Sequence, residues 1–364
     1  MKLFLYSDPQ LKNFLPLTYL RDFSELRLGF FKIIDYFKFL FPLLEVEKID
    51  KIKREKGLYF LVRFLPAKKI ENFKENLIFK FQNQVVGYLI VDEQEKAKEE
   101  VIDGFLLENL WDLICCQKEF LPIWQIPFSP ERFLDDFSFK VFGKKELVFI
   151  SQKAKILGEL ILNTEKGPIV IDDDVILKGF NYLEGPLYID KKTVVDNGKI
   201  RAYTTIGYDC RISGEIEASI FLDFVNKHHE GFIGHAYIGE WVNLGAYTTN
   251  SDLKNNYSEV KVKIKRKIYN TKMLKFGCVI GDHTKTAIGT LIPTGAVWGI
   301  CVNIKKGGPC EKFYPSFYWD KNKKWEFKKL IATISKVMAR RNRTLTEEEI
   351  KKLKKIYEDK KRPI

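Results

Sequence analysis

The sequence of 364 residues lacks several features that define common protein classes. It has no apolar run of 18 residues, which a membrane-spanning helix needs, and it does not open with a basic and apolar leader. We therefore expect a cytoplasmic protein that does not use a membrane. Its six Cys are scattered and form no CxxC pair, so they indicate reduced, buried thiols rather than a disulfide or zinc framework.

Histidine is also scarce, with four in the chain, and three of them (His228, His229 and His235) lie close together. Imidazole is the side chain whose unperturbed pKa lies nearest neutral pH. The cluster is followed, at 247–257, by a polar loop rich in Thr and Asn. Histidines on a regular scaffold beside such a loop indicate a candidate reactive site.

Charge of one sign is in excess, because the net charge is +13 and much of it lies in 261–275 and from Lys321 onward. A basic balance suits nucleic acid, anionic lipid or phosphorylated small molecules. We expect small-molecule phosphates as partners, with neither nucleic acid nor membrane. The length and the apolar share of 45% allow two domains with sizeable cores.

The region 1–142 predicts an α/β domain, because strand-like and helix-like segments alternate along it. We expect strands at 2–6, 57–65 and 77–91, where β-branched and aromatic residues combine with Gly punctuation. Apolar spacing predicts helices at 24–40 and 109–120.

Pro16-Leu17-Thr18, after an opening strand and a polar loop, resembles the start of sugar-nucleotide nucleotidyltransferases. The resemblance implies that Thr18, Arg21 and Arg27 bind a nucleotide, with Mg²⁺ as a possible cofactor. Two features depart from the family: the segment 6–9 has no glycine where the family has its phosphate loop, and the second strand ends in the segment 62–66, which has no Asp where the family places a magnesium-binding one. The domain resembles a shortened version of the family, and both nucleotidyl transfer and a degenerate or purely binding role remain open.

The region 143–318 carries an apolar residue at every sixth position over several stretches: 171–195, then 206 and 212, 232–244 and 280–298. Helices repeat near 3.6 and strands at 2, whereas six suits a triangular solenoid with a short strand and a corner on each side. The pattern resembles the hexapeptide repeat of acyltransferases, which implies an all-β left-handed parallel β-helix. An ordinary β-sandwich with chance spacing is the alternative.

Within this repeat, several motifs resemble the acetyltransferase half of bifunctional enzymes that make UDP-N-acetylglucosamine. A Lys and a His are followed by an aromatic residue, a Gly and then Asn-aliphatic-Gly-Ala at 243–246. The resemblance implies His229 as the catalytic base, with substrate-binding residues Lys227, Asn243, Asp252 and Lys261 and acetyl-CoA-binding residues Gly245, Ala246 and Thr286. Asp252 and Glu217 stand where the family has Asn and Lys, so the acceptor sugar is in doubt.

The chemistry of acetyl transfer fits these residue types. Neutral imidazole can take a proton as an amine attacks the thioester, and His228 is the alternative base. A backbone N–H at Gly245 or Ala246 could stabilise the developing oxyanion.

The tail, 319–364, predicts helices at 325–341 and 346–360, the second opened by a capping box. The β-helix resemblance implies a homotrimer with the coenzyme between subunits. Two other classes remain: a non-catalytic scaffold that binds a nucleotide sugar, and a γ-type zinc lyase, whose three-histidine spacing His229 and His235 do not match. We expect no metal ligands in the β-helix.

Overall fold

The computed structural model describes residues 1–364 except 54, 130–132, 135–137, 265–266, 321–322 and 360–364. By its contacts the chain divides into two units: Met1–Phe14 with Arg21–Pro127, and Leu15–Leu20 with Phe128–Ile364. The domain boundaries that we expect after 142 and 318 are not tested by this division and stay predictions. Within the described residues, every helix is too short or too polar to cross a membrane.

The first unit is built on a six-stranded mixed sheet, with strand order β4-β1-β5-β8-β7-β9. The first three strands run parallel and β8 is antiparallel to both of its neighbours. The strands are β1 (Lys2–Tyr6), β4 (Glu45–Ile49), β5 (Gly57–Leu61), β7 (Leu77–Phe81), β8 (Gln84–Ile90) and β9 (Lys98–Val101), with the smaller pair β6 (Phe64–Pro66) and β10 (Gly104–Leu106). The helices α1 (Ile33–Leu40) and α2 (Asp112–Glu119) complete the α/β architecture and confirm that fold class.

The helix predicted over 24–40 is wrong in its first half. A 3₁₀ turn (Phe23–Glu25) and a small hairpin of β2 (Arg27–Leu28) and β3 (Phe31–Lys32) precede α1. Gly29 sits in the hairpin turn with φ +55°, and a Cβ there would lie 2.3 Å from the carbonyl oxygen of Ile123. A positive φ in close contact with backbone cannot continue a helix, so the helical spacing of apolar residues was misleading here.

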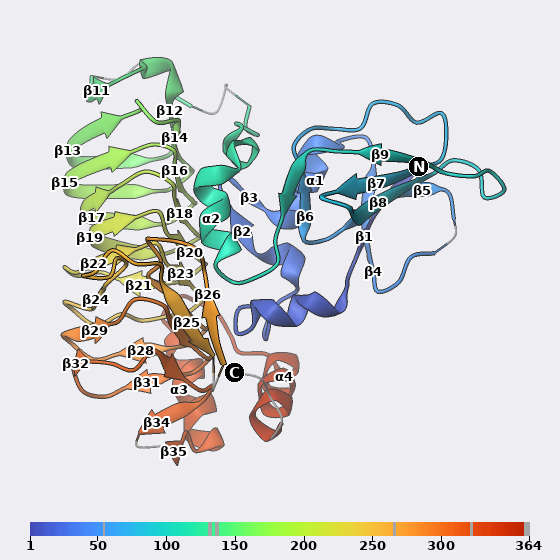
Figure 1. Cartoon of the computed structure of the whole chain (residues 1–364). Helices are drawn as coiled ribbons and strands as arrows, with labels where there is room; N and C mark the ends of the chain where they lie inside the picture. Colours follow the sequence, from blue (N-terminus) through green and yellow to red (C-terminus); the bar gives the residue numbers. More distant parts are fainter. Residues whose placement is uncertain (54, 130–132, 135–137, 265–266, 321–322, 360–364) are drawn as a thin grey trace. The chain divides into compact units, whose positions relative to one another are not determined.

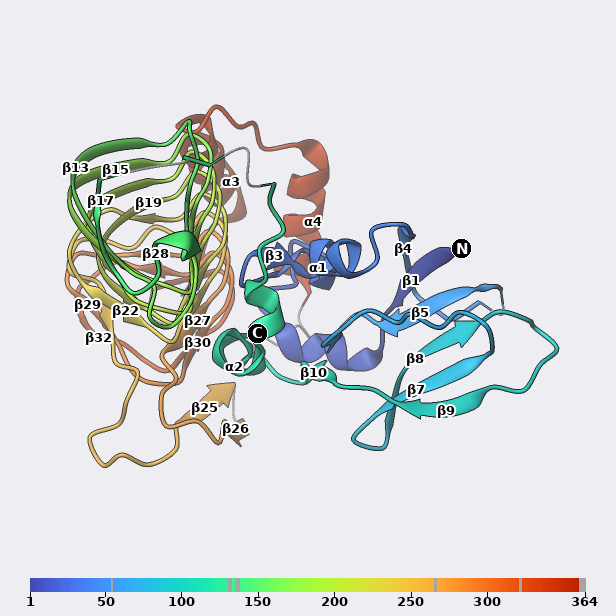
Figure 2. The same cartoon turned by 90° about the horizontal axis from the view of Figure 1, so that it is seen from above.

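The second unit is a left-handed parallel β-helix, whose coils stack along one axis in Figures 1 and 2. One side is a nine-stranded sheet: β12 (Val148–Ile150), β14 (Ile169–Ile171), β16 (Leu187–Ile189), β18 (Thr204–Ile206), β20 (Ile220–Phe221), β23 (Tyr237–Ile238), β27 (Cys278–Ile280), β30 (Ala296–Trp298) and β33 (Phe313–Tyr314). A second side is a seven-stranded sheet: β11 (Lys140–Phe142), β13 (Lys155–Asn163), β15 (Ile176–Glu184), β17 (Val194–Ile200), β19 (Arg211–Glu217), β21 (Asn226–Lys227) and β22 (Phe232–Gly234).

Shorter strands complete the coils and leave one excursion. They are β24 (Thr249–Asn250), β29 (Thr290–Ile292) and β32 (Gly308–Pro309) in one sheet, and the pair β28 (Lys285–Thr286) and β31 (Asn303–Ile304). The Lys-rich segment forms an antiparallel hairpin of β25 (Lys261–Ile264) and β26 (Lys267–Asn270). Two further strands, β34 (Tyr318–Asp320) and β35 (Lys323–Lys324), follow the last coil.

The six-residue repeat fills the inside of the coils. Ile171, Leu177, Leu183, Ile189 and Val195 are at most 1% exposed and belong to one continuous core. One position of the repeat is wrong: Phe232 is half-buried, and the adjacent Ile233 points into the core instead. The core residues Ile233 and Ile238 are five residues apart, so the spacing of six does not hold on this side of the coil.

Two helices end the chain, α3 (Phe327–Ala339) and α4 (Glu347–Glu358). The capping box predicted at the start of α4 is present, with Thr346 accepting from the N–H of Glu349. Lys360, the predicted end, lies outside the described residues. Leu330 and Ile334 of α3 pack with Trp241 and Phe317 in a second apolar cluster, so the tail is part of the fold of this unit.

Candidate functional site

His229, the predicted base, lies in a bulge of the seven-stranded sheet. Ile212 of β19 pairs with Lys227, and Glu215 pairs with Phe232, so the segment 228–231 bulges opposite the shorter segment 213–214. We call 228–231 the histidine bulge. His229 is exposed at this bulge, where a ligand could reach its imidazole.

Lys227 holds the histidine bulge from inside the coil. It occupies an inward position that Ile212 fills in the coil before, and it is only 2% exposed. Its Nζ donates to the backbone carbonyls of Ser213 and His229, each at 2.7 Å. Burial lowers its pKa to about 8. Lys227 therefore fixes the backbone beneath His229, and its role in substrate binding stays a prediction.

The alternative base, His228, faces a carboxylate. Its Nε2 lies 3.8 Å from Asp196 Oδ2, two coils earlier. Burial lowers the pKa of His228, and the charge of Asp196 opposes that effect without cancelling it. Its imidazole is therefore mostly neutral at pH 7, as a general base requires.

The predicted coenzyme-binding residues lie on the coils that follow the histidine bulge. The N–H of Tyr247 donates to the carbonyl of Glu230, which joins the turn at 245–247 to the bulge. The N–H of Gly245 already donates to Thr286 Oγ1 at 3.0 Å, so Ala246 is the better oxyanion donor of the two.

Asn243, predicted to bind substrate, lies one coil beyond Asn226. Asn226 Nδ2 donates to Asn243 Oδ1 at 2.9 Å. The structure thus brings together Lys227, His229, Asn243, Gly245, Ala246 and Thr286 on adjacent coils.

Asp252 pairs with a histidine that the sequence interpretation gave no role. Its Oδ2 lies 2.8 Å from His235 Nδ1, and both side chains are largely buried. Burial alone would raise the pKa of Asp252, but the hydrogen bond and the charges of His235 and Lys275 outweigh it, so the pKa lies below its usual value. The spacing could have revealed this pair, because 17 residues separate its members, as they separate Asn226 and Asn243.

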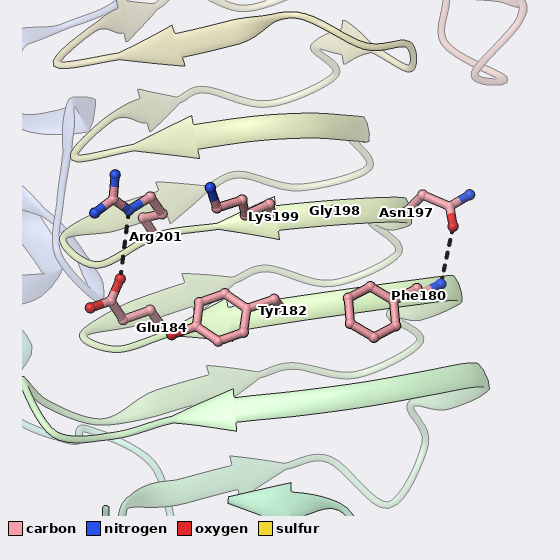
Figure 3. A pocket seen from close by; sticks show the side chains of 7 residues that line it. All are labelled: Phe180, Tyr182, Glu184, Asn197, Gly198, Lys199 and Arg201. Carbon is pink, nitrogen blue, oxygen red and sulfur yellow. Dashed lines mark hydrogen bonds and ion pairs between the residues drawn. The ribbon is translucent and has the colours of Figure 1, made fainter. Parts of the chain in front are cut away.

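The outer face of the seven-stranded sheet carries a shallow cavity of about 630 Å³ on β15 and β17. Figure 3 shows the rings of Phe180 and Tyr182 along β15, with Lys199 and Arg201 on the next strand. Arg201 is paired with Glu217 at 2.8 Å. Small-molecule sites commonly combine aromatic side chains with a few charged groups, and this surface belongs to the same sheet as the histidine bulge.

Glu217, which replaces the lysine of the resembled family, has two cationic neighbours. Besides Arg201, Lys275 lies 3.5 Å from its carboxylate. An ammonium group is thus present near this position, although it comes from a later segment. Lys261, by contrast, stands exposed at the start of β25, in the Lys-rich hairpin.

The predicted nucleotide-binding residues do not share one unit. Thr18 belongs to the second unit, whereas Arg21 and Arg27 lie buried in the first. Their nucleotide-binding role stays a prediction.

The strand ends of the first sheet hold an ion pair. Arg63 follows β5 and donates through Nε and Nη2 to the carboxylate of Asp8, which follows β1, at 2.8–3.1 Å. Gln10 and the carbonyl of Leu107 accept further hydrogen bonds from its guanidinium. A cation at the place of the expected magnesium ligand does not fit Mg²⁺, and the described residues hold no cluster of three His, Cys, Asp or Glu suited to a metal.

Comparison with curated proteins confirms the resemblance drawn from the motifs. The chain is 33% identical over 145 residues to a bifunctional sugar-1-phosphate nucleotidylyltransferase/acetyltransferase of Sulfurisphaera tokodaii, covering 39% of this chain and 36% of that protein. It is 28% identical over 243 residues to the bifunctional protein GlmU of Methanocaldococcus jannaschii, covering 60% and 54%. The chain thus spans about half, or less, of the length of these relatives.

No protein-family model matches the chain. Among solved structures, a variant of AntD, an N-acyltransferase from Bacillus cereus in complex with dTDP and coenzyme A, aligns with 55% of this chain and 92% of its own. The identity is 18% and the TM-score 0.23, a likeness too low to carry an argument.

Proposed function

We propose that the β-helix transfers an acetyl group from acetyl-CoA to the amine of an amino-sugar 1-phosphate. The observation that carries the proposal is an exposed His229 on a backbone fixed by buried Lys227. His229 takes the amine proton as nitrogen attacks the thioester, and the N–H of Ala246 stabilises the oxyanion. The names of the relatives support acetyl transfer to a sugar phosphate.

Release of free coenzyme A thiol tests this proposal. Purified protein with acetyl-CoA and glucosamine-1-phosphate should release thiol in proportion to protein concentration. Glucosamine without phosphate is the matched control and should react far more slowly. Thiol release that does not depend on any amino sugar would contradict the proposal.

A homotrimer is the assembly that we propose for this β-helix. Large apolar side chains stand exposed on its later coils: Tyr247 at 65%, Ile288 at 71% and Leu291 at 43%. Burial against neighbouring copies would remove this surface from water. Light scattering at micromolar concentration should give three times the mass of one chain, and a monomer would contradict the assembly.

For the first unit, a second candidate function is nucleotide-sugar binding without catalysis. The pair of Arg63 with Asp8 favours it, because the guanidinium neutralises the carboxylate that would otherwise attract Mg²⁺. The names of the relatives instead support nucleotidyl transfer. Calorimetry with UDP-N-acetylglucosamine, with and without Mg²⁺, tests this: binding independent of the metal supports a binding role, and Mg²⁺-dependent binding contradicts it.

A further inference from the structure

A second cavity, of about 420 Å³, lies between the end of α3 and a corner of the β-helix. Its basic lining groups are Arg211, His228, Lys285, Arg340 and Arg341. All belong to the second unit, so one chain supplies the whole cavity. Arg340 and Arg341 come from the basic C-terminal tail, so this part of the tail lines a cavity.

Cations outnumber the carboxylates that could neutralise them. Asp209 is shared by two guanidiniums, at 2.7 Å from Arg211 and 3.7 Å from Arg341. Within the described part of the chain, the buried Nε of Arg341 makes no hydrogen bond. Burial and the charge of Arg211 lower the pKa of Arg341, and burial lowers that of Lys285. A bound anion would relieve this crowding of positive charge.

The cavity also has an aromatic wall. The rings of Phe224 and Trp241 stack with centroids 4.1 Å apart and planes 9° apart, and both residues line the cavity. Arg343 lies over the Phe224 ring at 5.5 Å. Guanidiniums that can bind an oxyanion in a bidentate manner, beside a flat apolar surface, match a phosphate attached to an organic group.

We propose that this cavity binds the phosphate of a small organic phosphate ester, which Arg340 and Arg341 hold against the aromatic wall. If the proposed acetyl transfer holds, the ester is either the sugar phosphate or the coenzyme. The phosphate site itself does not depend on that function. His228 lines both this cavity and the histidine bulge, so a ligand here reaches the neighbourhood of the predicted base. The site thus assigns a role to the C-terminal end of α3.

Calorimetry with inorganic pyrophosphate tests the site without any need for turnover. Arg340→Gln combined with Arg341→Gln should weaken binding at least about 10-fold, the usual worth of charge-assisted hydrogen bonds. Lys336→Gln removes an exposed charge from the same helix outside the cavity and should leave binding within about twofold. Arg340→Gln alone changes an exposed side chain and serves if the double variant does not fold.

The source of the phosphate is resolved by repeating the titrations with glucosamine-1-phosphate, coenzyme A and dephospho-coenzyme A. A loss confined to coenzyme A identifies its 3′-phosphate, and a loss confined to the sugar phosphate identifies the acceptor. Equal binding by the double variant and Lys336→Gln, or no pyrophosphate binding by the parent protein, would overturn the site. Pyrophosphate binding without thiol release would instead count against acetyl transfer alone.

Discussion

The strand ends of the first sheet and the outer face of the β-helix both carry polar side chains, but these side chains are paired with one another at the strand ends and partly exposed on the β-helix. At the strand ends, Arg63 and Asp8 neutralise each other and the guanidinium is fully buried. At the histidine bulge, a buried lysine bonds to backbone carbonyls and leaves His229 exposed. Groups that satisfy one another internally build structure, whereas groups held in place but left exposed can act on a ligand.

The largest expected effect comes from removing the imidazole of His229. His229→Ala should lower kcat for acetyl transfer by about 10²–10⁴-fold, the usual contribution of a general base. KM for acetyl-CoA should change little, because the imidazole acts mainly in the transition state. Steady-state kinetics of the two proteins checks this, with the melting temperature as a control for folding. An unchanged kcat would remove His229 from the mechanism.

At the strand ends, the largest effect should be on stability. Arg63→Ala leaves Asp8 without its partner, and breaking a buried pair costs about 3–5 kcal/mol. We expect a loss near the low end of this range, because the Asp8 side chain is 19% exposed and water can partly solvate its charge. Denaturant unfolding should detect the loss, whereas Lys2→Ala, in an exposed pair with Glu47, should change little. Equal stability of the two variants would show that Arg63 is not a structural residue.

Buried Lys227 should make the stability of the β-helix depend on pH. Its pKa is lowered to about 8 in the folded chain from 10.5, so between these values the unfolded chain binds more protons and stability rises with pH. The gain is roughly 3 kcal/mol from a shift of this size. The free energy of unfolding, measured at pH 7.5 and 10.5, should rise by this amount in the parent protein. It should rise equally in the control Lys178→Met, which changes an exposed lysine. Lys227→Met should lack it, and an identical pH dependence in all three would refute the role of burial.

The smallest expected effect comes from the neighbouring histidine. His228→Ala should lower kcat less than about 10-fold, since this side chain faces Asp196 and the second cavity. The same kinetic assay measures both histidine variants. If their effects were reversed, the register that places His229 as the base would be wrong by one residue.

Most of the β-helix was predictable because its core imposes a period on the sequence. Each coil needs an apolar side chain inside, so Ile171 to Val195 repeat every six residues. The repeat fails just after the histidine bulge, where the core residues Ile233 and Ile238 are five residues apart and Phe232 is only half-buried. The site motifs were recognised from their order and spacing, whereas the pairing of Asp252 with His235 becomes visible only at the longer spacing of one coil, which is 17 residues here.

In the first unit, the sequence predicted β1, β5, β7, β8 and α2, but not the edge strands β4 and β9 or the ion pair at the strand ends. Asp8 and Arg63 are separated by 55 residues and meet only because β1 and β5 are parallel neighbours. The helical spacing before α1 concealed the hairpin at Gly29. Long-range pairings and single backbone conformations therefore account for what the sequence did not show.

One reaction mixture tests the contrast between the two regions most directly. Parent protein with acetyl-CoA, glucosamine-1-phosphate, UTP and Mg²⁺ is followed by mass spectrometry. An active β-helix and a neutralised ion pair at the strand ends predict N-acetylglucosamine-1-phosphate without a nucleotide sugar, and His229→Ala should abolish most of that product. Formation of any nucleotide sugar, before or after acetylation, would contradict the account.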